Sequence, residues 1–404
     1  MKKIILSFVI FASITSLAQN QTNAPEINSI AKANNQFAFD LYAKMSEKEK
    51  GNLFYSPFSL SSALAMTYAG AGSTTALEMG KVLHFQPNSP VFHQNFGAYL
   101  AKIAANAEGN IEFEIANRIW VEQSVKFEEE FLERIKESYS GGVEKANFIA
   151  NYEATRVLIN AWVEQKTKER IKDLIPKGIL NSDTRMVLVN AIYFKGDWLH
   201  PFDSLDTKDD VFHVGNGKDI TAKFMHQTGH FKYADGESCK MIQVPYQGGK
   251  QSMIIALPHG FDDLDATEKE LQRDGFERLK NASQRLIQLK FPKFRMTMPL
   301  VLKEYFRALG MKTPFEDSAN FSQMTKEQRL YISEIIHKAF VEVDEKGTEA
   351  AAATAVVMAV TASASFEITY EIPFIADHPF LYYIIDNETN AILFMGRMCE
   401  PKIN

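Results

Sequence analysis

The chain is organised around one long connection, which reads Glu345-Lys-Gly-Thr-Glu-Ala-Ala-Ala-Ala-Thr-Ala-Val-Val-Met-Ala-Val-Thr-Ala-Ser-Ala-Ser365. A strand-like segment over 331–343 precedes it, and an apolar run over 372–385 follows it. Long connections in compact domains are usually functional or disordered. This one has no proline and a single glycine, Gly347, whereas disordered linkers are rich in proline, lysine and repeated glycine or serine. We therefore expect a loop that can become a strand.

Alternation of side chains supports this expectation, because successive residues of a strand point to opposite faces. If Thr348 faces inward, then so do Ala350, Ala352, Thr354, Val356 and Met358. None of these positions carries a charge or an aromatic ring, and Glu349 would face solvent. The alternative is an alanine-rich surface helix or linker, since alanine is the best helix former. Composition alone leaves both interpretations open.

The flanks of this connection resemble the serpins, a family of metastable serine-protease inhibitors. Residues 345–353 match the serpin hinge, and Phe374-Ile-Ala-Asp-His-Pro-Phe-Leu-Tyr-Tyr-Ile384 matches the signature after the reactive loop. The resemblance covers nearly all of the chain after residue 28, with motifs in the family's order. It implies an α+β fold with a large mixed central β-sheet, two smaller sheets, about nine helices and an exposed reactive-centre loop at about 345–371.

The resemblance also implies a hinge and a breach, where loop insertion begins. Trp198 and Lys293 occupy the breach, and Glu345 is expected to pair with Lys293 of Phe291-Pro-Lys-Phe294. The hinge comprises Glu345, Gly347, Thr348, Ala350, Ala351, Ala352, Ala353 and Thr354.

An upstream match, Asn52-Leu-Phe-Tyr-Ser-Pro-Phe-Ser59, predicts a buried helix. Ser56 followed by Pro57 is typical of an N-cap and first helical position. The next turns, 61–72, are rich in alanine, serine and glycine, so this helix can approach other backbone closely. The resemblance places it beneath the central sheet.

Two polar residues are expected inside buried strands. Asn190 interrupts the apolar run Val187-Leu-Val-Asn-Ala-Ile-Tyr-Phe194, which is typical of a strand covered on both faces, and it must find hydrogen-bond partners there. Alternation over 335–343 places His337 on the inward face, where a lone histidine is usually a satisfied core residue. By resemblance, Ser56, Ser59, Asn190 and His337 form the shutter, a polar cluster where strands of the sheet must part.

The resemblance predicts the scissile bond by counting along the loop. In inhibitory serpins the residue before this bond lies about fourteen places past the hinge glycine, a length set by the reach of an inserted strand. Counting from Gly347 gives Thr361-Ala362, with Val360 and Ser363 as alternatives because the loop is a few residues longer than usual. These residues are small and uncharged, and no arginine or lysine lies between Thr348 and Ser365. We therefore expect elastase-like or subtilisin-like proteases as targets.

The implied activity is suicide inhibition of a serine protease through a covalent acyl-enzyme, followed by insertion of the cleaved loop into the central sheet. The alternative is a non-inhibitory serpin that acts as a binding protein or a protease substrate. Such proteins usually have charge, proline or bulk in the hinge, which this chain lacks apart from the outward Glu349. A secreted hydrolase would need a nucleophile and base that the sequence does not offer, so we expect no enzyme.

The N-terminus predicts secretion. Met1 to Ala18 has a basic start at Lys2 and Lys3, an apolar core and small residues before the cleavage point, as signal peptides do. The apolar run is shorter than the roughly 20 residues of a membrane anchor. We expect a polar leader over 19–28, a single serpin domain over 29–404, and a monomer in the periplasm or outside the cell.

Charge argues against polyanionic partners. Removing Lys2 and Lys3 lowers the basic residues from 44 to 42 against 50 acidic ones, which leaves a net charge of −8. Nucleic acid and anionic membranes are therefore not expected as partners. Heparin-activated serpins carry a basic helix where this chain has Glu128, Glu129, Glu130 and Glu133, so heparin activation is not expected either.

Other chemical motifs carry little weight. His226 and His230 have the spacing of helical zinc ligands, but no carboxylate motif accompanies them, so we expect no metal or cofactor. Ser29-Ile-Ala-Lys32 matches one motif of the acylating serine enzymes, but their other motifs are missing from the sequence. Cys239 and Cys399 leave two alternatives, one disulfide or two buried free thiols, of which we expect the second. A helix opening at Asn160 is expected to continue to Ile175.

Overall fold

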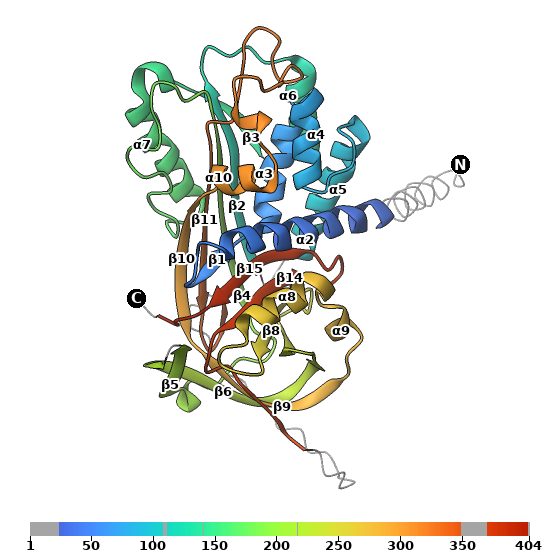
Figure 1. Cartoon of the computed structure of the whole chain (residues 1–404), viewed down its shortest axis with the longest axis vertical. Coiled ribbons are helices and arrows are strands. Elements are labelled where there is room, and N and C mark those ends of the chain that lie inside the picture. Colours follow the sequence, from blue (N-terminus) through green and yellow to red (C-terminus); the bar gives the residue numbers. More distant parts are fainter. Residues whose placement is uncertain (1–23, 108–110, 140, 216, 349–369, 403–404) are drawn as a thin grey trace, which may run out of the picture.

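The computed structural model describes residues 24–107, 111–139, 141–215, 217–348 and 370–402. Helices and two mixed sheets confirm the α+β class (Figure 1). The helices of the described residues are α2 (Ala24–Ser46), α3 (Pro57–Tyr68), α4 (Ser73–Val82), α5 (Pro90–Asn106), α6 (Glu129–Ser138), α7 (Phe148–Lys166), α8 (Leu264–Asp274), α9 (Glu277–Lys280) and α10 (Lys303–Leu309).

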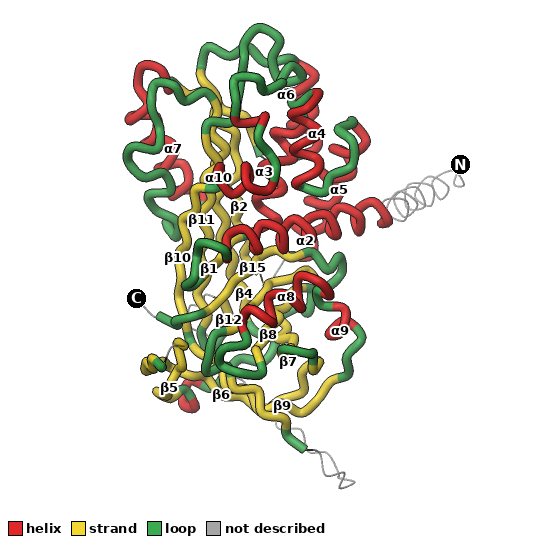
Figure 2. Tube along the Cα trace, viewed as in Figure 1, coloured by secondary structure: helices red, strands yellow, loops and turns green. Residues whose placement is uncertain are grey.

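The central sheet has six strands in the order β10-β11-β12-β4-β2-β3. Their bounds are β2 (Ile111–Glu122), β3 (Gly142–Ala146), β4 (Met186–Asp197), β10 (Phe294–Val301), β11 (Glu334–Val343) and β12 (Gly347–Thr348). The sheet is mixed, because β4 pairs antiparallel with β2 but parallel with β11. Figure 2 shows β10, β11, β2 and β4 running side by side along the long axis of the molecule.

A second sheet of nine strands fills the lower half of the molecule (Figure 2). Its strands are β1 (Leu53–Tyr55), β5 (Lys208–Gly215), β6 (Lys218–Asp235), β7 (Cys239–Pro245), β8 (Gln251–Pro258), β9 (Gln284–Pro292), β13 (Ile372–Ile375), β14 (Phe380–Asp386) and β15 (Ile392–Met398). The two smaller sheets expected from the sequence are joined here, because the 18-residue β6 bonds in turn to β5, β9 and β7.

Strand β4 is covered on both faces, as its apolar run predicts. Its even-numbered apolar residues, such as Leu188 and Ile192, belong to the core cluster shared with α3. Its odd-numbered residues, such as Val189 and Tyr193, pack in a second cluster with Phe148 and Ile159 of α7. Figure 1 shows α7 on one side of the central sheet and α3 to α6 on the other. Asn190 is even-numbered, and its amide accordingly bonds to Ser59 of α3.

The buried helix predicted after Ser56 is confirmed. The Ser56 hydroxyl accepts a hydrogen bond from the Ser59 amide at 3.0 Å, and Pro57 takes the first turn. Every residue of α3 is buried. Its small side chains allow it to pack closely against β2, β4 and β15.

The predicted helix from Asn160 to Ile175 is wrong at both ends, because α7 begins at Phe148 and has Asn160 in its interior. Helix α7 ends at Lys166, and Lys168 and Glu169 have φ of 49° and 60°, in the left-handed region that stops a helix. The chain then turns back, and the Asn160 side chain accepts from the Ile175 amide at 2.8 Å and donates to its carbonyl at 3.1 Å. A buried polar side chain thus replaces the expected helical bonds.

Smaller details complete the fold. Helix α2 is described from Ala24, so part of the predicted leader is helical. Cys239 and Cys399 are both free thiols, as expected, but only Cys239 is buried, because Cys399 is half-buried. Within the described part of the chain, no helix has the length and apolar character needed to cross a membrane.

Candidate functional site

The site is a place in the central sheet where a strand is incomplete. Strands β11 and β4 pair directly and in parallel, from Glu334 opposite Val187 to Phe340 opposite Tyr193. At one end they diverge, and β12 lies between them, antiparallel to both. A chain that continued past Thr348 along this path would form antiparallel ladders on both sides, which are slightly more stable per residue than the parallel pairing it would replace.

The two residues of β12 are closely fitted. A Cβ at Gly347 would lie 2.1 Å from the carbonyl oxygen of Gly196, so no larger residue fits without displacing β4. Thr348 is fully buried, and its Oγ1 lies 2.8 Å from the hydroxyl of Tyr246. The Thr348 side chain therefore already faces inward in the intact chain, as predicted from alternation.

Trp198 holds the turn that leads into β12. Its indole Nε1 donates to the Asp344 carbonyl at 3.0 Å, and its amide donates to the Lys346 carbonyl at 2.7 Å. The buried indole stacks on the ring of Tyr246, with centroids 4.7 Å apart and planes at 10°. Tyr246 therefore links Trp198 to Thr348, a role that its position in the sequence did not indicate.

Glu345 and Lys293 form the ion pair expected from the sequence, with Lys293 Nζ 2.6 Å from Oε2. The Thr207 hydroxyl donates to Oε1 of the same carboxylate at 2.7 Å. Burial raises the pKa of the Glu345 carboxyl, but the hydrogen bonds from Lys293 and Thr207 outweigh it and hold that pKa below its usual value. The pair ties Glu345, the first residue of the hinge, to Lys293, the residue between β9 and β10.

The second polar cluster lies beneath the middle of β11 and β4. The Ser56 amide donates to Nε2 of His337 at 3.1 Å, so Nδ1 carries the proton and donates to Oδ1 of Asn190. Complete burial lowers the pKa of His337 to about 3, which keeps the imidazole neutral. The Ser56 hydroxyl donates to the Leu393 carbonyl at 2.6 Å. The cluster thus bonds α3 to both strands that would separate.

Asn117 belongs to this cluster and was not identified from the sequence. It stands opposite Asn190 in the register of β2 and β4, and Asn190 stands opposite His337 in that of β4 and β11. Its Oδ1 accepts from the Asn190 amide and from the Ser59 hydroxyl, the latter at 3.2 Å. Alternation in the sequence could have placed Asn117 on the inward face of β2, because Ile115 and Ile119 lie on the same face and belong to the core.

Several predicted site residues lie outside the described part of the chain. These are Ala350, Ala351, Ala352, Ala353 and Thr354 of the hinge and Val360, Thr361, Ala362 and Ser363 around the predicted scissile bond.

The discounted motifs take no part in the hydrogen bonds of either cluster, although His226 lies 2.9 Å from the carbonyl of Asp206, next to Thr207. His226 and His230 lie on strand β6, where four residues span about 13 Å, so their spacing does not form a helical zinc pair. No group of three or more metal-ligating side chains occurs among the described residues. Ser29 and Lys32 are exposed on α2.

The chain is similar to known proteins over most of its length. The family model described as Serpin (serine protease inhibitor) matches residues 32–401. Human Serpin B4 is 38% identical over 395 residues, which cover 93% of this chain and 100% of Serpin B4. The leukocyte elastase inhibitor of Xenopus tropicalis is 38% identical over 384 residues, with coverage of 93% and 100%. The crystal structure of Serpin48 from the insect Tenebrio molitor has a TM-score of 0.83 at 30% identity, covering 93% of this chain and 98% of Serpin48.

Proposed function

The chain belongs to the serpin family, and we propose that it inhibits a serine protease by suicide-substrate trapping. The protease serine attacks the carbonyl of Thr361, the amine of Ala362 leaves with the C-terminal fragment, and an acyl ester remains. The cleaved loop then enters the central sheet between β11 and β4 and carries the bound protease with it. Trapping succeeds when insertion is faster than attack of water on the ester.

The observation that carries this proposal is the parallel pairing of β11 and β4 with β12 between their diverging ends. An inserted strand would replace one parallel interface by two antiparallel ones, so it would gain backbone hydrogen bonds and bury the inward side chains. β12 already supplies the first step of this path. The free energy for distorting the protease would thus come from completion of the sheet.

Two polar clusters would control the process. The breach, with Trp198, Lys293 and Glu345, keeps the hinge in place at the entry point. The shutter, with His337, Asn190 and their partners on α3, bonds both strands to the core below them and would resist their separation. Insertion requires rearrangement of both, so the clusters set the rate of the transition.

The proposed targets are elastase-like or subtilisin-like proteases that form a covalent complex with a monomeric inhibitor. The small, uncharged residues around Thr361 suit a shallow apolar specificity pocket, and a relative of 38% identity bears the name leukocyte elastase inhibitor. A trypsin-like pocket with a buried carboxylate would find no cation in the loop between Thr348 and Ser365. Secretion through the signal at Met1 to Ala18 would place the inhibitor with such proteases outside the cytoplasm.

The test combines gel analysis with mass spectrometry. We expect a complex with an elastase-like protease that resists SDS, together with a released peptide that begins at Ala362. The control is the same protease with its catalytic serine replaced by alanine, which can bind the loop but cannot form the ester. Cleavage without a stable complex would instead support the alternative of a non-inhibitory serpin that acts as a substrate.

A further inference from the structure

A cavity of about 160 Å³ lies where the C-terminal half of α2 and the helix α8 pack on β14 and β15. Apolar side chains of α2, β14 and β15 form its inner wall, namely Phe39, Ala43, Leu381 and Met395. Exposed residues of α8 complete the lining, so the cavity opens to solvent on that side. A protein cavity of about 150 Å³ can bind benzene, so this one has room for a single ring.

One hydroxyl of the lining has no partner. Tyr383 of β14 lines the cavity, its side chain is fully buried, and its hydroxyl makes no hydrogen bond to any described residue. Burial raises the pKa of this phenol well above its usual value, and the nearby Glu268 carboxylate adds to the shift, so the hydroxyl stays protonated. An unpaired buried polar group is costly, and nearly all such groups in proteins are bonded. The Tyr383 hydroxyl therefore calls for a polar partner in the cavity.

Two carboxylates of α8 set the charge of that partner. The mostly buried Glu268 accepts at Oε1 from the Tyr42 hydroxyl at 2.5 Å and from Arg397 at 3.0 Å, whereas its Oε2 makes no hydrogen bond within the described part of the chain. Asp265 is exposed at the mouth of the cavity and has no ion pair among the same residues. Lys269, the basic residue of the lining, is exposed at the surface. The free acceptors therefore favour a ligand that donates hydrogen bonds and carries positive charge.

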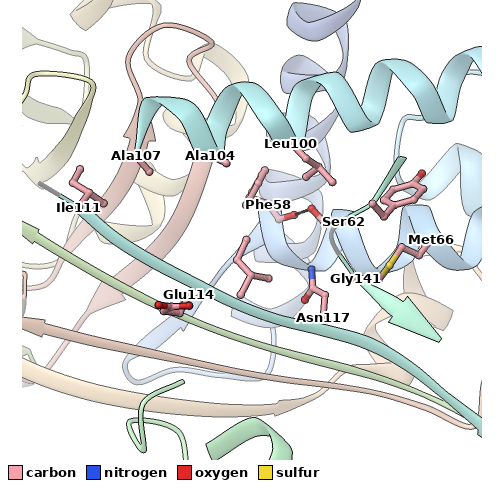
Figure 3. A pocket seen from close by; sticks show the side chains of 12 residues that line it. Phe58, Ser62, Met66, Leu100, Ala104, Ala107, Ile111, Glu114, Asn117 and Gly141 are labelled. Carbon is pink, nitrogen blue, oxygen red and sulfur yellow. Dashed lines mark hydrogen bonds between the residues drawn. The ribbon is translucent and has the colours of Figure 1, made fainter. Parts of the chain in front are cut away.

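A larger cavity of about 440 Å³, between α3, α5 and β2, lacks such groups. Figure 3 shows the Ser62 hydroxyl in its wall directed to Phe58, whose carbonyl accepts from it at 2.6 Å. The Tyr139 hydroxyl lies 2.6 Å from Nδ1 of His93, and no described residue of this lining has an unpaired buried side-chain polar atom. Unpaired polar groups, rather than volume, therefore distinguish the cavity beside α8.

We propose that the cavity between α2, α8 and β14 binds a small organic cation, in which an ammonium group is attached to about one ring of apolar atoms. The ammonium donates to Oε2 of Glu268 and to the Tyr383 hydroxyl, and the ring packs on Phe39 and Leu381. Charge-assisted hydrogen bonds are roughly twice as strong as neutral ones, and the aromatic rings of the wall also attract a cation. The inference does not depend on protease inhibition.

The test titrates the intact full chain with benzylamine by calorimetry, with benzyl alcohol as the neutral probe of the same shape. We expect saturable binding of one benzylamine per chain below about 10 mM, tighter than that of benzyl alcohol by about fivefold or more. Tyr383→Phe keeps the ring and removes only the unpaired hydroxyl, so it should fold and should bind benzylamine about fivefold more weakly. Asp265→Asn should narrow the difference between the two probes.

The position of the site is tested by filling the cavity. Ala43→Trp should weaken benzylamine binding by about tenfold or more, because the indole takes the space of the ring. Ala266→Trp is the control, since Ala266 is exposed on α8 and does not line the cavity. If Ala43→Trp does not give a cooperative melt, Ala43→Leu takes its place.

Two results would overturn the site, which are no saturable binding of either probe and equal affinity of the wild type and the Ala43 variant. Equal loss in both alanine variants would place the probe elsewhere and would overturn it too. Equal affinity for benzylamine and benzyl alcohol would refute the choice of a cation. If no protease forms a stable complex, the proposed function fails, but the titration still decides the site.

Discussion

Replacing Thr348 by arginine tests which face of the hinge enters the sheet. Thr348 is fully buried between β11 and β4, with its hydroxyl 2.8 Å from that of Tyr246. Arginine at this position would lose the hydrogen bond and would place a cation against the stacked rings of Tyr246 and Trp198. Insertion of the cleaved loop would also require the arginine side chain to be buried. The substitution should therefore destabilise β12 in the intact protein and slow the insertion that traps the protease.

The magnitude follows from these contacts. Loss of the hydrogen bond costs about 1 kcal/mol, and an uncompensated buried charge costs about 3–5 kcal/mol. Expelling the two-residue β12 costs less, roughly 1–3 kcal/mol for its few hydrogen bonds, so the variant should fold with the hinge outside the sheet. Insertion must still bury the cation, and a barrier higher by about 3 kcal/mol slows it on the order of 100-fold. Hydrolysis of the acyl-enzyme should then win the competition.

The assay is the stoichiometry of inhibition of an elastase-like protease, with the yield of SDS-resistant complex measured in parallel. Thr348→Arg should be cleaved as a substrate and should form almost no complex. Thr348→Ser, which keeps the hydroxyl, is the matched control and should inhibit nearly as the wild type does. An unchanged stoichiometry for Thr348→Arg would refute the assignment of the inserting face.

Three further predictions concern stability. Loop cleavage should raise the melting temperature sharply, because the inserted segment completes two antiparallel ladders, and equal melting of intact and cleaved protein would contradict the mechanism. Glu345→Gln should destabilise the intact protein by about 2 kcal/mol at pH 7. The pKa of Glu345 is lowered in the native state, so its stabilising contribution is complete above the unfolded-state pKa and is lost as pH falls through the native-state pKa. In urea unfolding at a series of pH values, Glu345→Gln should therefore lose less stability in acid than the wild type does. His337 has a native pKa lowered to about 3, so the wild type should lose stability as pH falls from about 6.5 toward 3, and His337→Gln should reduce this slope by about one proton. A pH dependence equal to that of the wild type would contradict the assignment of a neutral buried imidazole.

The local elements of the site could be predicted from the sequence because their signals are local. The apolar run around Asn190 indicates a strand covered on both faces, and Ser56 with Pro57 indicates the start of α3. Alternation places His337 inward without any knowledge of its neighbours. The pairing of Glu345 with Lys293 needed the family resemblance, since the two residues lie far apart in the chain.

The tertiary structure alone decided which of these elements meet. Asn117 joins the shutter because β2 lies beside β4 in a register that aligns it with Asn190, and neither strand order nor register can be read from the composition of β2. Tyr246 reaches Thr348 because it forms an antiparallel bridge with Trp198, where the chain leaves β7 of the second sheet and β4 of the first. Local patterns determine which face of an element is buried, whereas the partners on that face depend on contacts between segments far apart in the sequence.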